Sequence, residues 1–177
     1  MWQLTLIFIA FALFVTYNTI LVINNGIPKS LSESFYIYDS KKKGLGYVFS
    51  AFLLTTVGLM LPSWLDVGEF INPNFTFLIF LTLASLLFVG ATPAFKDNPM
   101  VGNIHDYAAK FGVMTALIWC FVVCMDIWWI PLVAALIPTI TCILTKTWKG
   151  NVVFWLEMIA FSAIFASVII SSVIVID

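Results

Sequence analysis

Long runs of apolar residues, separated by short polar segments, are the main pattern of this chain. A helix needs about 20 mostly apolar residues to cross a hydrocarbon core roughly 30 Å thick. Backbone groups inside a bilayer must be hydrogen-bonded within the protein, so such runs predict membrane-spanning helices. The pattern therefore predicts an all-α polytopic membrane protein, a single domain over residues 1–177 built as a bundle of six transmembrane helices. The expected spans are residues 2–23, 45–65, 75–92, 104–125, 128–145 and 151–176.

Two of these segments need separate comment. The first begins "MWQLTLIFIAFALF", with no basic residue ahead of the apolar run and no small-x-small cleavage site after it. We therefore expect it to remain as a span and not to be removed as a signal peptide. The fifth is short and contains two prolines. Pro131 fits the first turn of a helix, whereas Pro138 predicts a kink or a shortened helix.

Composition supports the membrane assignment and excludes one class of partner. The chain is 62% hydrophobic and 10% charged, whereas soluble domains are about 45–50% apolar and about 25% charged. It contains lysines but no arginine, and its net charge is −1. No basic face is available for a nucleic acid, which we exclude as a partner. Cys120, Cys124 and Cys142 lie in apolar runs, where we expect them to pack as small hydrophobic residues.

The lysines predict the orientation of the bundle. With six spans, both termini share one side of the membrane with the second and fourth loops, and the other loops face the opposite side. The terminal side carries Asp66, Glu69, Asp126 and Asp177 and no lysine. Cytoplasmic loops are enriched in basic residues, so we expect both termini outside, in the inner membrane of a bacterium. The lysines of the other side are Lys29, Lys41, Lys42, Lys43, Lys96, Lys110, Lys146 and Lys149.

Tryptophans fit the same frame. Tryptophan is enriched at membrane interfaces, where its ring is part apolar and part polar. Trp119 lies in the middle of a predicted span, and we expect it to pack in the interior. The residues expected to be interfacial anchors are Trp2, Trp64, Trp128, Trp129 and Trp148.

The first loop, residues 28–44, contains a helix signal. Ser30 and Glu33 match the S-x-x-E capping box, and apolar residues follow at helical spacing. We expect a short amphipathic helix in the cytoplasmic interface. Lys41, Lys42 and Lys43 come next, and each lysine near the surface would attract anionic lipid by about 1 kcal/mol. The alternative is that these lysines only set the topology.

The stretch "VGNIHDYAAKFG", residues 101–112, holds the only histidine of the sequence. Asn103 is a candidate N-cap, which places Asp106 near the positive end of the helix dipole. Asp106 and Lys110 are four residues apart and can pair along one helix face. His105 points roughly 100° away from Asp106, so the two do not form a hydrogen-bonded dyad. One interpretation is simply a capped helix start.

A second interpretation of this stretch involves Glu157. This carboxylate lies about two turns into the last span, at a depth similar to that of Lys110 in the fourth. A carboxylate at this depth is costly unless it is paired, neutralised or exposed to water. We therefore predict an ion pair between Lys110 and Glu157, with His105 and Asp106 at its mouth. Such a pair is either structural or the lining of a polar pocket for a headgroup or a proton.

Motifs for catalysis are missing from the sequence. It contains no Walker loop, HExxH, CxxC, nucleophile elbow or spaced histidine pair. We therefore predict no catalytic residues, metal or cofactor, and favour a small membrane protein that binds lipid, a membrane protein or a second copy of itself. One alternative is a proton- or ion-coupled transporter or channel that uses Glu157 and Lys110. Another is an intramembrane enzyme acting on lipid, with His105 and Asp106 as acid or base.

Two short features resemble a known family. A Pro-x-x-x-Ser stretch follows the first span in "IPKSLSES", and His105 is followed by Ala109 at helical spacing, with Phe111 close to the next position of that spacing. This pattern is similar to six-span proteins of the Frag/DRAM/Sfk type and to uncharacterised bacterial six-span proteins. The resemblance implies a regulatory or lipid-associated membrane role without established catalysis, and it assigns no site residues. The family's first loop generally faces away from the cytoplasm, whereas here that loop carries lysines.

Overall fold

The computed structural model describes the backbone of residues 2–123 and 127–176 and the side chains of residues 2–121 and 127–174. All regular structure in these ranges is helical, which confirms the predicted all-α class. The elements are α1 (Trp2–Asn25), α2 (Ser34–Lys41), α3 (Tyr47–Ile71), the 3₁₀ turn η1 (Pro73–Phe75), α4 (Thr76–Ala91), α5 (Pro99–Ile118), the π-helical turn η2 (Trp119–Val123), α6 (Trp129–Thr145) and α7 (Trp148–Ile176).

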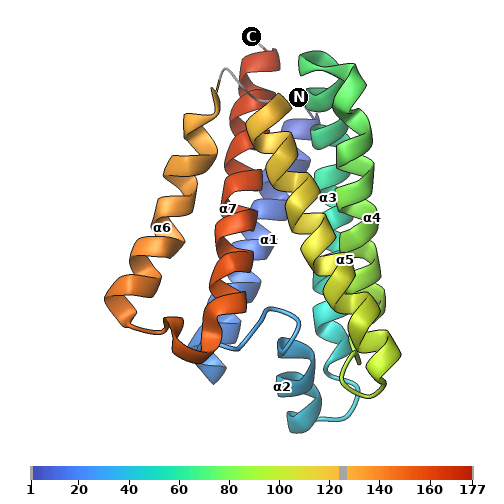
Figure 1. Cartoon of the computed structure of the whole chain (residues 1–177), viewed down its shortest axis with the longest axis vertical. Coiled ribbons are helices and arrows are strands. Elements are labelled where there is room, and N and C mark those ends of the chain that lie inside the picture. The colour runs from blue at the N-terminus through green and yellow to red at the C-terminus, as the bar shows by residue number, and fades with distance from the viewer. Residues whose placement is uncertain (1, 124–126, 177) are drawn as a thin grey trace.

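The long helices run side by side along the long axis of the molecule (Figure 1). Both ends of the chain lie at one end of the bundle, which we call the terminal end, and α2 lies at the other, which we call the α2 end. Helix α3 packs between α1 and α4, and α5 packs against α4. Helix α7 contacts α1, α3 and α5, whereas α6 packs mainly against α7 and stands at the edge of the bundle.

Within the described ranges, four helical segments are long and apolar enough to cross a membrane: Trp2–Asn25, Tyr47–Ile71, Pro73–Ala91 and Trp148–Ile174. They make the chain an integral membrane protein of the helical-bundle type. Helices α5 and α6 are the other two long elements, and they correspond to the fourth and fifth predicted spans.

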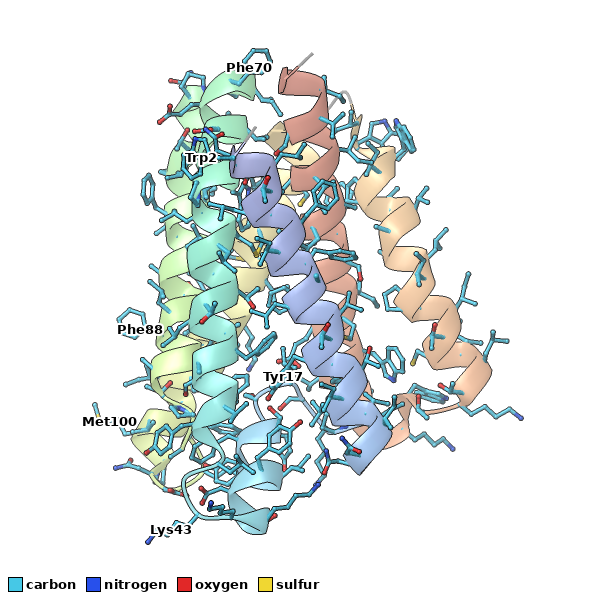
Figure 2. All side chains as sticks on the ribbon, turned by 180° about the vertical axis from the view of Figure 1, so that it is seen from behind. Trp2, Tyr17, Lys43, Phe70, Phe88 and Met100 are labelled. Atoms are coloured by element: carbon cyan, nitrogen blue, oxygen red, sulfur yellow. The ribbon has the colours of Figure 1, made fainter. Side chains whose placement is uncertain are left out.

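Apolar side chains cover the outside of the bundle as well as its core. Phe70, Phe88 and Met100 project away from the helices (Figure 2) and are largely exposed. Aromatic contacts hold the interior, where Tyr17 stacks on Phe52 with 3.8 Å between ring centroids. An apolar exterior over a packed core is expected when lipid surrounds the protein.

Helix α5 begins earlier than expected. Its N-cap is Asn98, whose side-chain oxygen accepts a hydrogen bond from the Met100 N–H at 2.9 Å, and Pro99 is the first helical residue. Proline suits this position because its fixed φ is already helical and its missing N–H is not needed there. The prediction of Asn103 as the N-cap is therefore wrong. Asp106 lies about two turns inside the helix, beyond the reach of its dipole.

Other boundaries also differ from the prediction. Helix α3 continues to Ile71, so Asp66 and Glu69 lie on its last turns and not in a loop. Helix α6 runs through Pro138 to Thr145 and is not shortened by it. The fourth predicted span ends in the π-helical turn η2. Cys124, Asp126 and Asp177 lie outside the described residues.

One tryptophan prediction fails. Trp64 is fully buried and packs edge-to-face on Trp119, with 5.4 Å between ring centroids. It was expected at the interface because it lies near a helix end, but it faces the interior of the bundle. Trp119 is buried as predicted. The exposed tryptophans are Trp2, Trp128, Trp129 and Trp148.

The contact between α4 and α5 depends on a glycine. A Cβ atom at Gly112 would lie 3.0 Å from the Ser85 Cβ, and a buried hydrogen bond of 2.8 Å joins Thr82 to Thr115 beside it. Small residues allow such close helix approach in membranes. We expect Gly112→Leu to lower the free energy of unfolding by about 1–3 kcal/mol through overpacking.

The matched control for this prediction is Gly58→Leu, in the middle of α3, where a Cβ would have no neighbour within 4 Å. Thermal unfolding of both variants in detergent tests it. Equal melting temperatures for the two variants would show that Gly112 does not set the spacing of α4 and α5.

Candidate functional site

Glu157 is a charged residue inside the bundle, on the part of α7 near the α2 end. Its Oε2 accepts a hydrogen bond of 2.6 Å from the backbone N–H of Leu31. Leu31 belongs to the segment between α1 and α2, and only 3% of its surface is exposed. The first loop therefore enters the bundle, and its backbone meets the carboxylate there.

A second hydrogen bond holds the same loop against α7. The Phe154 N–H donates to the Lys29 carbonyl at 3.0 Å. The backbone of α7 is non-helical at residues 149–151, so Phe154 lies in the first turn of the regular helix, where N–H groups have no intrahelical acceptor. We call Lys29, Leu31, Phe154 and Glu157 the clamp, because two loop residues and two helix residues form its two hydrogen bonds.

A small cavity adjoins the carboxylate. Its volume is about 30 Å³, which is enough for about one water molecule. Glu157 is partly accessible, and Ser32 is the other polar residue among those that line this space. The apolar walls are Leu31, Leu53, Leu86, Val89, Ala109, Val113 and Phe161.

The predicted ion pair between Lys110 and Glu157 is not formed. Across the described side chains, the one salt bridge joins Lys96 Nζ to Glu33 Oε1 at 2.6 Å. Lys110 is exposed, and its Nζ lies 6.0 Å from the centroid of the Tyr107 ring. The similar depth predicted for Lys110 and Glu157 is consistent with the structure, because Ala109, next to Lys110, lines the Glu157 cavity. The next residue along a helix is rotated by about 100°, which turns Lys110 away from it.

His105 is buried in a different environment. It is 2% exposed, its Nδ1 lies 3.1 Å from the Thr92 carbonyl oxygen, and its ring stacks on Phe95 with 4.3 Å between centroids. A proton on Nδ1 would donate to that carbonyl. The histidine thus joins α5 to the segment after α4. Asp106 is exposed and forms no salt bridge with Lys110 in the described part of the chain.

The four residues predicted to form one polar cluster therefore occupy separate places. Glu157 meets the first loop, His105 meets the segment after α4, and Asp106 and Lys110 lie on the surface. The partners that sequence reasoning missed are backbone groups, the Leu31 N–H and the Lys29 carbonyl. A side-chain motif gives no signal for such groups.

Helix α2 is tied into the α2 end of the bundle. As the capping box predicts, Ser30 Oγ accepts a hydrogen bond from the Glu33 N–H at 3.2 Å, but the Glu33 carboxylate binds Lys96 and does not return to Ser30. The buried Ser34 Oγ lies 2.7 Å from the Tyr17 hydroxyl. We call residues 29–36 the plug, because they join α1, α7 and the segment after α4 at this end.

Tyr36 completes the plug. Its hydroxyl accepts a hydrogen bond of 2.6 Å from the backbone N–H of Lys96. Burial raises the pKa of Tyr36, so the hydroxyl stays protonated in neutral solution. The plug is thereby joined to Lys96 through both a backbone and a side-chain contact.

The lysine run follows the plug. Lys41 ends α2, and Lys42 and Lys43 lie just beyond it, all exposed. Figure 2 shows Lys43 pointing away from the bundle at the α2 end. Their contact with anionic lipid stays a prediction.

The described helices leave apolar grooves on the outside of the bundle. One, of about 580 Å³, runs between α4 and α5. Another, of about 370 Å³, lies between α1, α6 and α7. We call the second one the α6 groove. It is lined by Asn18, Thr19, Val22, Ile23, Ile137, Pro138, Phe154, Trp155, Met158 and Ser162.

Asn18 is the unusual member of the α6 groove. Its Nδ2 donates to the Phe14 carbonyl at 2.8 Å, which fixes the orientation of the amide. Its buried Oδ1 has no hydrogen-bond partner among the described residues. A buried acceptor without a donor is uncommon and needs a structural or functional explanation.

Within the described ranges, no group of three or more His, Cys, Asp or Glu side chains is placed to hold a metal ion. Comparisons with family models, curated proteins and solved structures find no match for this chain.

The contact between Ser34 and Tyr17 gives a stability test of the plug. Ser34→Ala leaves the buried Tyr17 hydroxyl without its partner, which should lower the free energy of unfolding by about 1–3 kcal/mol. Ser40→Ala is the matched control, because Ser40 lies on the exposed side of the same helix and bonds only to the nearby Ile37 carbonyl. Chemical or thermal unfolding in detergent measures both. A loss no larger for Ser34→Ala than for Ser40→Ala would contradict the role given to this contact.

Proposed function

We propose that all six long helices cross the membrane, with the α2 end in the bacterial cytoplasm and both termini outside. The shared position of the termini (Figure 1) fits an even number of crossings. Every lysine lies either in a loop at the α2 end or on a part of a helix within the half of the bundle nearer that end. The positive-inside rule then assigns this end to the cytoplasm.

The lengths of α5 and α6 are compatible with this topology. His105 lies level with Thr92 at the end of α4, so residues 99–104 extend beyond α4. The remaining part, residues 105–123, is about 28 Å long at 1.5 Å per residue. Lys110 is then about one turn and a half from the cytoplasmic end, within reach of the interface for a long side chain. Helix α6, with 17 residues, is at the short end of the range for a span.

Cysteine labelling tests this topology. In a background with Cys120, Cys124 and Cys142 replaced by alanine, an impermeant maleimide added to intact cells should label Glu69→Cys. It should label Lys42→Cys only after the membrane is permeabilised. Both wild-type positions are exposed and lie at opposite ends of the bundle. The reverse pattern, or labelling of both in intact cells, would overturn the proposed orientation.

We further propose that the protein binds a membrane lipid, with an acyl chain in the α6 groove. The observation that carries this proposal is the groove itself, which has walls from three helices and is lined mostly by apolar side chains. In a membrane, hydrocarbon chains are the apolar molecules available to fill it.

Tryptophan substitutions that fill the groove test lipid binding. Thr19→Trp and Ile137→Trp place a large ring in the groove from its two sides, since both residues line it. The controls are Val15→Trp, about one turn before Thr19, and Ile140→Trp, nearly one turn after Ile137. Both residues are exposed and lie outside the groove lining. We expect the first pair to reduce the lipid retained after purification at least twofold, as measured by native mass spectrometry, and the controls to retain it. Equal retention in all four variants would exclude this groove.

Proton-coupled transport is the second candidate function, and the Glu157 cavity favours it. The cavity brings space for about one water molecule to an intramembrane carboxylate. Intramembrane carboxylates commonly mark proton or ion pathways. The enzymatic alternative has less support. The hydroxyl nearest His105 is that of Thr92, at 3.3 Å, and it already donates to the Phe88 carbonyl, while the His105 Nδ1 lies closer to the Thr92 carbonyl, at 3.1 Å.

A further inference from the structure

We infer that Glu157 is a proton-binding site, and that the proton it takes up loosens the first loop from α7. This inference does not depend on lipid binding in the α6 groove. It rests on the clamp geometry, on the cavity beside the carboxylate and on the absence of a cationic partner among the described side chains.

The residues that line the cavity beside Glu157 offer no positive charge, so a proton is what can neutralise its carboxylate. Helix α3 presents Leu53, α4 presents Leu86 and Val89, α5 presents Ala109 and Val113, α7 adds Phe161, and the loop adds Leu31 and Ser32. None of these described side chains titrates in the physiological range or carries a charge. The other charged or titratable residues on the same elements do not face Glu157. Glu33 is paired with Lys96, and His105 is bound to the Thr92 carbonyl. The remaining charged residues are exposed: Lys29, Asp66, Glu69, Asp106, Lys110 and Lys149.

Proton uptake by Glu157 weakens its bond to the Leu31 N–H and leaves the bond from Phe154 to Lys29 unchanged. An ionised carboxylate forms a charge-assisted bond to the Leu31 N–H, roughly twice as strong as a neutral one. When a proton from water binds to the carboxylate, the negative charge is lost and the bond becomes a neutral one. The new O–H needs an acceptor, and the cavity holds space for about one water molecule. The bond from Phe154 to Lys29 joins two backbone groups and does not respond to the proton.

The loosened segment is short and has defined ends. On its C-terminal side, Glu33 and Ser34 are fixed by Lys96 and Tyr17. On its N-terminal side, Gly26 has a φ of +75°, a backbone conformation that glycine adopts without strain. Closer to the carboxylate, the bond from Phe154 still holds Lys29. Residues 30–32 are therefore the part that can move when the Glu157 bond weakens, and their movement would open the cavity toward the α2 end.

Hydrogen–deuterium exchange of the full-length protein in lipid nanodiscs tests this inference. The measured quantity is the protection of backbone amides in residues 27–33, corrected for intrinsic exchange, between pH 5 and 9. Wild-type protection should be high when Glu157 is ionised and should fall on the order of tenfold as the pH is lowered, as expected for loss of a charge-assisted bond. Peptides from residues 2–12 of α1, at the terminal end, provide an internal reference, because this stretch lies far from the clamp and contains no titratable side chain.

Two variants separate the proton from other causes. Glu157→Gln retains the shape and an acceptor for Leu31 but cannot ionise, so protection of residues 27–33 should be low and independent of pH. Glu69→Gln removes an exposed carboxylate at the other end of the bundle and should behave like the wild type. Wild-type protection that does not change with pH overturns the inference, and this measurement needs no variant to fold. Glu157→Gln that keeps the full protection of the ionised wild type also overturns it.

Discussion

The cost of holding a carboxylate inside an apolar bundle shapes the whole α2 end of this protein. Glu157 needs a hydrogen-bond donor, and the Leu31 N–H supplies it at 2.6 Å. For this donor to reach the carboxylate, the chain must turn back into the bundle directly after α1, which the positive φ of Gly26 permits. The plug, its contact with Tyr17 and its salt bridge to Lys96 follow from that return.

Helix α7 connects this polar end to the apolar surface of the molecule. Its Glu157 side chain faces the internal cavity, whereas Phe154 and Met158 on the same turns line the α6 groove. Phe154 has two roles, because its backbone N–H belongs to the clamp and its side chain lines the groove. Helix α6 packs mainly on α7, so the same helix supports the groove and carries the carboxylate.

Hydropathy predicted the helical class and the approximate places of the long helices, because lipid leaves the outer surface apolar as well as the core. It placed the starts of α1, α3, α4 and α6 within two residues but misplaced the start of α5. The start of α5 is set by Asn98 and Pro99, a capping signal present in the sequence but outside the apolar run. It also did not give the direction in which a residue faces: Trp64 lies near a helix end, as an interfacial anchor would, yet faces the interior.

At the candidate site, too, the sequence pattern did not give the direction in which a residue faces, and there this changes the chemistry of the site. Depth matched Lys110 with Glu157, but depth gives no rotation about the helix axis, and Ala109 rather than Lys110 lines the cavity. A lysine there would have stabilised the ionised carboxylate and suppressed its protonation. A single backbone N–H stabilises the charge far less and binds the neutral form as well. The arrangement observed in place of the predicted ion pair is therefore the one that leaves Glu157 free to exchange a proton.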